Sequence, residues 1–188
     1  MGNTVTNVTT GKPKVGGAVY VAPIGTTPPA DAVTALDAAF KCLGYVSEDG
    51  VKNSASPNTD TVKAWGGDTV LNTNQGRDDT FTFTLIEALN IDVLKFVYGS
   101  ANVTGTWTGT SGDALDIAVN GKDTDDVVVA IDMIQRGGVL KRVVMPCAHV
   151  TDVGEIAYTD SDAVGYETTV TCQPDASGNY HHEYIAKQ

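Results

Sequence analysis

The stretch RDDTFTFTLIEALNIDVLKFVYG, residues 77–99, decides the fold, because its periodicity changes from that of a strand to that of a helix. Threonine and phenylalanine alternate over residues 80–84, which predicts a strand with one buried face. A helical stripe follows, ending at Gly99, and the sequence leaves open whether the helix starts at Glu87 or is capped by Asn90. The side chains predicted to pack this helix onto the core are Leu89, Val93 and Phe96.

Length and composition favour one folded, sheet-rich domain. The chain has 188 residues, enough to bury a substantial core, and 41% of them are hydrophobic. Threonine, valine, glycine and aspartate are abundant, which favours strands and turns. The formal net charge of −11 argues against a basic nucleic-acid-binding surface. We also expect no membrane segment, because no apolar run approaches the roughly 20 residues that cross a bilayer.

The pattern along the chain predicts a mainly β fold, either a β-sandwich or a barrel, with one flanking α-helix. Residues 1–16 are polar and are expected to form an extended N-terminal arm. Residues 17–188 are expected to form a single β domain that includes a polar C-terminal tail. About ten strand segments at a spacing of roughly 8–12 residues are typical of such a domain. Besides residues 80–86, the expected strands are 18–22, 45–47, 61–65, 68–74, 114–119, 126–134, 139–145, 156–158 and 166–173.

Glycine, proline and asparagine mark the expected turns and loops. Asp49-Gly50 predicts a tight turn, and residues 53–60, which contain a proline, predict a long loop. Asn120-Gly121 and Gly137-Gly138 predict hairpin turns between successive strands. Residues 174–184 are expected to be a surface tail.

The sequence contains no recognisable catalytic or nucleotide-binding motif, so we expect neither an enzyme nor a cofactor. The three cysteines are odd in number and lack metal-binding spacing, which favours free thiols. His149 has no neighbour that marks it as a base, and His181-His182 lie in the expected tail. We therefore expect all three histidines to be structural or solvent-facing.

Acidic residues gather at Asp123, Asp125 and Asp126. A calcium loop needs carboxylates at fixed spacing with a bidentate glutamate at its end, and nothing closes this loop. We therefore expect no metal site. A solvated turn is the simplest interpretation, and an acidic surface with a specific role is the alternative.

Several segments, taken in order, resemble the major tail tube proteins of long-tailed, siphovirus-type bacteriophages. They are GKPKVGGAVYVAPIGTTPPADA (residues 11–32), LGYVSEDGV (43–51), VKAWGGDTV (62–70) and FTFTLIEALNIDVLKFVYG (81–99). Each segment alone is weakly specific, whereas their order and spacing together are more specific. The last third of the chain carries less of the resemblance.

The resemblance implies a virion structural protein that joins its sheets side by side into rings, which are expected to be hexameric. The rings would stack into a hollow tube that delivers DNA without binding it specifically. The implied partners are other copies of the chain and the tape measure, tail-tip and tail-terminator proteins. The implied location is the phage tail, after synthesis in the host cytoplasm. Acidic side chains would suit the channel wall or the ring rim, and Asp123, Asp125 and Asp126 are the candidates.

Two other classes of protein remain open on the sequence. A β-sandwich adhesion or binding module fits the threonine-rich strands, although residues 1–17 lack the apolar segment of a signal peptide. A carbohydrate-processing enzyme fits only the number of acidic residues, since aromatic residues for a sugar-binding cleft make up just 7% of the chain.

Overall fold

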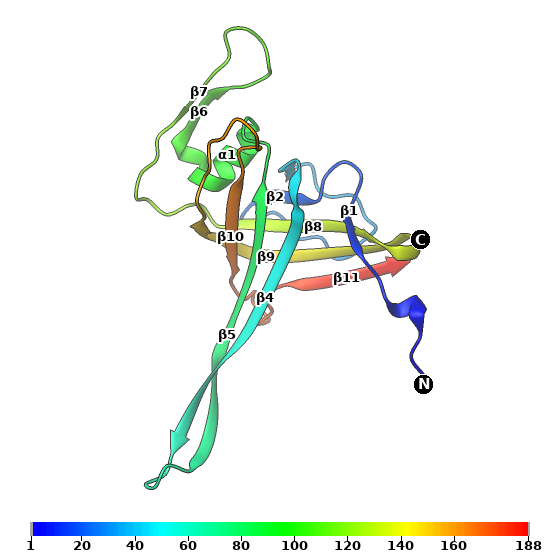
Figure 1. Ribbon diagram of the computed structural model, residues 1–188, viewed down its shortest axis with the longest axis vertical. Coiled ribbons are helices and arrows are strands. Elements are labelled where there is room, and N and C mark those ends of the chain that lie inside the picture. The colour runs from blue at the N-terminus through cyan, green and yellow to red at the C-terminus, as the bar shows by residue number, and fades with distance from the viewer. Residues whose placement is uncertain (1, 188) are drawn as a thin grey trace.

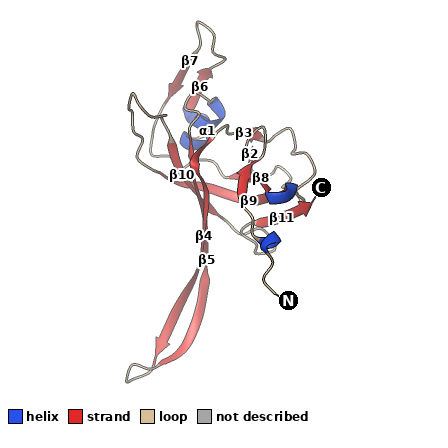
Figure 2. Cartoon of the chain, turned by 45° about the vertical axis from the view of Figure 1, so that its right-hand side comes forward, coloured by secondary structure: helices blue, strands red, loops and turns tan. Residues whose placement is uncertain are grey.

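A computed structural model describes residues 2–187 and shows a mainly antiparallel β protein with one α-helix (Figures 1 and 2). Nine strands form one sheet in the order β3-β2-β8-β9-β10-β5-β4, with β1 added to β8 and β11 added to β9. These strands are β1 (Gly11–Pro13), β2 (Val19–Pro23), β3 (Lys41–Cys42), β4 (Val46–Lys63), β5 (Thr69–Leu85), β8 (Val127–Gln135), β9 (Val139–Val153), β10 (Tyr166–Cys172) and β11 (His182–Lys187).

Outside the nine-stranded sheet, the chain forms two more strands, one α-helix and three short 3-10 turns. Strands β6 (Val103–Thr106) and β7 (Ala114–Ile117) pair to form a separate two-stranded sheet. The helix is α1 (Ile91–Tyr98). Short 3-10 turns are η1 (Val5–Asn7), η2 (Ser100–Asn102) and η3 (Arg136–Gly138).

The β8–β9 hairpin is the centre of the body, and both of its strands change partner along their length. Strand β8 pairs with β2 over residues 127–131 and with β1 over residues 133–135. Strand β9 pairs with β11 over residues 139–144 and with β10 over residues 148–153. One continuous sheet thereby supplies more than one face around the core, consistent with the expected β-sandwich.

Helix α1 covers the core at the end of β5, as the change of period predicts. The Asn90 side chain accepts a hydrogen bond from the Asp92 N–H at 3.0 Å, so Asn90 is the cap, and Gly99 ends the helix at φ 91°. Val93 and Phe96 are buried, and the Phe96 ring stacks on Phe83 with 6.3 Å between centroids.

The assignment of Leu89 to this buried face is wrong. Leu89 is 58% exposed and precedes the Asn90 cap. The chain there is not helical, so the 3.6-residue period that would turn Leu89 toward the core does not extend back to it.

Two predicted breaks in the chain are instead parts of one 18-residue strand, β4. Gly50 has a φ of 69°, and the pairing register shifts between Val46 and Val51, so Asp49-Gly50 lies in a bulge and not in a turn. Residues 53–60, predicted as a loop, pair with β5 throughout. Pro57 is tolerated because β4 lies at the edge of the sheet.

Several other sequence predictions also need correction. Residues 156–158 are not a strand, and Asn120-Gly121 does not join paired strands, because β7 pairs with β6 and β8 pairs with β9. The predicted C-terminal tail ends in β11, which pairs with β9. Gly137-Gly138 does join a hairpin, β8–β9, with φ values of 78° and 76°.

Candidate assembly surfaces

The outer half of the β4–β5 hairpin projects from the body as a two-stranded ribbon (Figures 1 and 2). Every residue from 56 to 72 is exposed, although their backbones continue the antiparallel ladder. Threonine, asparagine, aspartate and serine dominate this half, so neither face presents a continuous apolar surface to a core. A two-stranded ribbon with both faces exposed to solvent is only marginally stable in isolation, which indicates a role outside the folding of the monomer.

The tip of this hairpin carries exposed apolar side chains. The turn at residues 64–68 is closed by the Ala64 N–H, which donates to the Asp68 carbonyl at 2.8 Å, and both of its glycines have positive φ. The Trp65 side chain on this turn is fully exposed. Exposed apolar clusters on a soluble surface mark interaction sites. We call the following four residues the tip cluster: Val62, Trp65, Val70 and Leu71.

Polar contacts around one buried carboxylate fix the root of the hairpin. Asp79 is 1% exposed and accepts a hydrogen bond from the Asn53 amide at 2.7 Å. The other Asp79 oxygen contacts Nδ1 of His181, in the segment that leads into β11. The prediction that His181 is a surface residue is therefore wrong. The three groups join both strands of the hairpin to the C-terminal segment, which holds the ribbon in a fixed direction.

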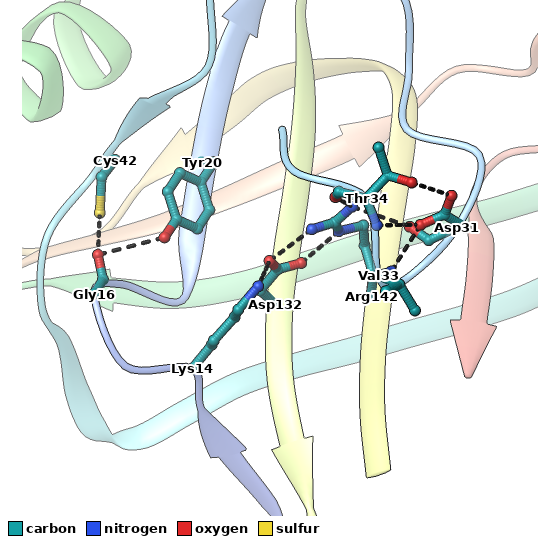
Figure 3. Close-up of polar contacts among 9 residues, drawn as sticks. All are labelled: Lys14, Gly16, Tyr20, Asp31, Val33, Thr34, Cys42, Asp132 and Arg142. Atoms are coloured by element: carbon teal, nitrogen blue, oxygen red, sulfur yellow. Dashed lines mark hydrogen bonds and ion pairs between the residues drawn. The ribbon is translucent and has the colours of Figure 1, made fainter. Parts of the chain in front are cut away.

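A buried polar cluster lies on the β8–β9 hairpin (Figure 3). Arg142 donates through Nε to Asp132 at 2.6 Å and through Nη2 at 2.9 Å, and Lys14 adds a longer ion pair of 3.4 Å. Arg142 Nη1 also donates to the carbonyls of Asp31 and Thr34, at 3.0 Å and 2.8 Å. Hydrogen bonding to Asp132 raises the pKa of Arg142 above its usual value. The cluster therefore ties the loop at residues 31–34 and the N-terminal segment to the body.

At the opposite end of the long axis from the hairpin tip lies an open pocket of about 720 Å³. Three connections form it: β5 to α1, the loop after β6 and the loop before β10. Leu89 and Trp107 line it and are 58% and 41% exposed. We call it the apical pocket, and its lining residues are Ile86, Glu87, Ala88, Leu89, Asn90, Ile91, Trp107, Thr108, Gly109, Ala163 and Val164.

The three acidic candidates lie together on the connection between β7 and β8. Asp123 is exposed, Asp125 accepts a hydrogen bond from the Ser100 hydroxyl, and Asp126 contacts His149 Nδ1 at 3.1 Å. Two of the three carboxylates are therefore engaged in local contacts. Their position in an assembly stays a prediction.

Within residues 2–187, no group of three or more His, Cys, Asp or Glu is placed to hold a metal ion. Burial raises the pKa of Cys172 to about 12, which keeps this thiol protonated and unreactive near neutral pH. In the same part of the chain, no helix is long and apolar enough to cross a membrane.

Comparison with known protein families identifies the family of the chain. A family described as phage tail tube protein matches residues 9–188, which is nearly the whole chain. No curated protein matches the chain. The match includes the projecting hairpin, the body and the apical pocket.

Proposed function

The chain belongs to the phage tail tube protein family, and we propose that it forms rings, hexameric in the simplest case, that stack into a DNA-conducting tube. Family membership makes it a structural subunit of the virion tail. Formation of rings, their stacking and the passage of DNA are what we propose beyond family membership. The projecting outer half of the β4–β5 hairpin supports them best, because residues 56–72 are all exposed and add nothing to the core of a monomer.

Unpaired sheet edges are suited to joining subunits within a ring. In the described part of the chain, the main sheet begins at the two-residue strand β3 and ends at β4, which pairs only with β5. An unpaired edge is an aggregation hazard in a monomer and a joining surface in a closed ring. We propose that neighbours in a ring meet at these edges and that the hairpins then join one ring to the next.

The charge of the chain suits a channel through which DNA slides. Lysine and arginine contacts to phosphate give sequence-independent affinity, which would hold a passing genome. The chain carries 23 acidic and 12 basic residues, and carboxylates near the channel would repel the backbone. Screening limits this repulsion to about 8–10 Å at physiological salt. We propose that acidic side chains line the channel or its rim, with Asp123, Asp125 and Asp126 as candidates. A neutral or basic channel surface in an assembled ring would refute this part.

Partners other than the chain itself follow from the proposed role. A tube of this kind joins a tail tip at one end and a terminator at the other, and it encloses a tape measure protein. These partners, and synthesis of the chain in the host cytoplasm, belong to the proposal.

Shortening the hairpin tests the proposed role in assembly. Ser56 and Asp78 lie directly opposite each other in the ladder, so an Asn-Gly turn can replace residues 57–77 without disturbing the body. The purified wild-type chain should form rings or tubes in negative-stain electron microscopy. The shortened chain should remain folded by circular dichroism and form no tubes. Normal tubes from the shortened chain would refute the stacking role, and the absence of rings and tubes from the wild type would refute the proposed function.

A further inference from the structure

We propose that the tip cluster of one copy docks in the apical pocket of a second copy, with Trp65 as the anchor. This inference rests on the proposed function and identifies the acceptor site for the hairpin. It begins from one observation: the chain has only two tryptophans, Trp65 and Trp107, and each lies exposed at one of these two places.

The contact has to be between copies. The tip and the apical pocket lie at opposite ends of the long axis (Figure 1). Strand β5 alone separates them by 17 residues, about 55 Å at roughly 3.3 Å per residue. A hairpin fixed at its root by Asp79 and His181 cannot fold back over that distance.

The tip has the chemistry of an interface anchor. A tryptophan buries about 150–250 Å² when it enters a pocket, and tryptophan is enriched among the residues that dominate binding energy. Val62 and Leu71 are paired across the two strands just behind the turn. Both are exposed and stand next to the turn that carries Trp65, so a short segment offers one large aromatic side chain with aliphatic neighbours.

The apical pocket has the matching chemistry. At about 720 Å³ it is large enough for an indole ring and aliphatic neighbours, and its exposed large apolar side chains are Leu89 and Trp107. Its one charged lining residue is Glu87, which accepts hydrogen bonds from the Tyr45 N–H at 3.0 Å and the Asn90 amide at 2.9 Å. Lys63 stands beside the tip turn and Asp68 lies in it, so the tip carries one charge of each sign and the match with the pocket is mainly apolar.

The geometry predicts an open-ended stack. Tip and pocket are different surfaces, so the contact is heterologous and repeats head to tail without closing on itself. A single tip contact is smaller than the roughly 1,600 Å² of a standard stable interface. One pair of copies should therefore bind weakly, whereas several contacts between two rings act together.

Cysteine pairs test the docking in the full-length chain. A variant carrying both Asp68→Cys at the tip and Ala163→Cys in the pocket should give a ladder of disulfide-linked multimers under oxidising conditions. Each single variant has one new thiol and should give no ladder. The wild type, which has three cysteines of its own, sets the background.

Substitution of the two tryptophans gives an independent readout. Trp65→Ala and Trp107→Ala should each raise the protein concentration needed for assembly at least tenfold, while Ile185→Ala, an exposed control on β11, should leave it unchanged. Wild-type tryptophan fluorescence should shift to shorter wavelength on assembly, as both rings leave water. The docking would be overturned, and the proposed function left intact, if the double-cysteine variant formed tubes without a ladder and Trp65→Ala assembled normally. Absence of the ladder from the double-cysteine variant, together with a wild type that forms neither rings nor tubes, would overturn both.

Discussion

Two hairpins in this molecule share their local design and differ in nearly everything else. Both β8–β9 and β4–β5 are antiparallel and turn at a pair of glycines, Gly137-Gly138 and Gly66-Gly67. Residues 128–132 of β8 are all buried, because other strands pair on both sides of the hairpin. Residues 56–72 are all exposed. The same backbone ladder therefore serves stability in one hairpin and, we propose, assembly in the other.

The largest effect on stability should come from the buried ion pair of the body hairpin. Arg142→Met would leave the Asp132 carboxylate, which is 4% exposed, with only the longer contact to Lys14. An uncompensated buried charge costs about 3–5 kcal/mol in the free energy of unfolding. The neighbouring Lys141→Met removes a partly exposed pair with Glu183 and should cost at most about 1 kcal/mol. Equal losses for the two variants in urea unfolding would show that the buried cluster has no special role.

Substitution of Phe96 and of Leu89, both predicted to pack the helix, should have different effects on the free energy of unfolding in urea. Phe96→Ala should lower the free energy of unfolding by about 3–5 kcal/mol, because the ring stacks on Phe83 in the core. Leu89→Ala should change it by no more than about 0.5 kcal/mol and should instead weaken assembly. A loss for Phe96→Ala below about 1 kcal/mol would contradict the packing described here.

In the wild-type chain, backbone amides should exchange hydrogen far more slowly in the β8–β9 hairpin than in the outer half of the β4–β5 hairpin. Amides of residues 128–132 should exchange only through global unfolding. Amides of residues 59–72 should exchange through local opening that requires little free energy, and their exchange should slow on assembly. Equal protection of both hairpins in the monomer would remove the distinction between them.

A smaller, pH-dependent effect on stability is expected from Asp175, in the turn before β11. Hydrogen bonds, first from the Asn179 N–H and also from His182 and Ser177, lower the pKa of Asp175 from 3.8 to about 2. Because the folded-state pKa is the lower one, Asp175 stabilises the fold above about pH 4, and this contribution disappears as the pH falls through 2. Asp175→Asn should therefore be less stable than the wild type at pH 7, with the gap closing toward pH 2. A gap that persists at pH 2 in thermal unfolding would contradict this assignment.

The sequence predicted the body far better than the hairpin, for a physical reason. Residues 80–84 and 91–98 bury one face, so their apolar side chains recur with the period of a strand and then of a helix. Residues 53–60 bury neither face of the strand, so their apolar side chains do not recur with the two-residue period of a strand. Pro57 also favours the interpretation as a loop. Gly50 fits either a turn or a bulge, and only the long-range pairing with β5 selects the bulge.

The candidate surfaces were predictable only in part. Strands on both sides of Gly66-Gly67 follow from sequence, but the projection of that hairpin beyond the body does not. The contact of Asp79 with His181 joins residues 102 positions apart, with no local pattern. Leu89 shows the same limit, since the Asn90 cap decides whether it faces the core or the apical pocket.

A reconstruction of the assembled chain by electron cryomicroscopy tests the central claim most directly. The expected map shows stacked rings in which the β4–β5 hairpin of each subunit reaches into the next ring. The Trp65 ring should contact Leu89 and Trp107 of the subunit there. A tube whose hairpin tips lie in solvent, with empty apical pockets, would contradict the account.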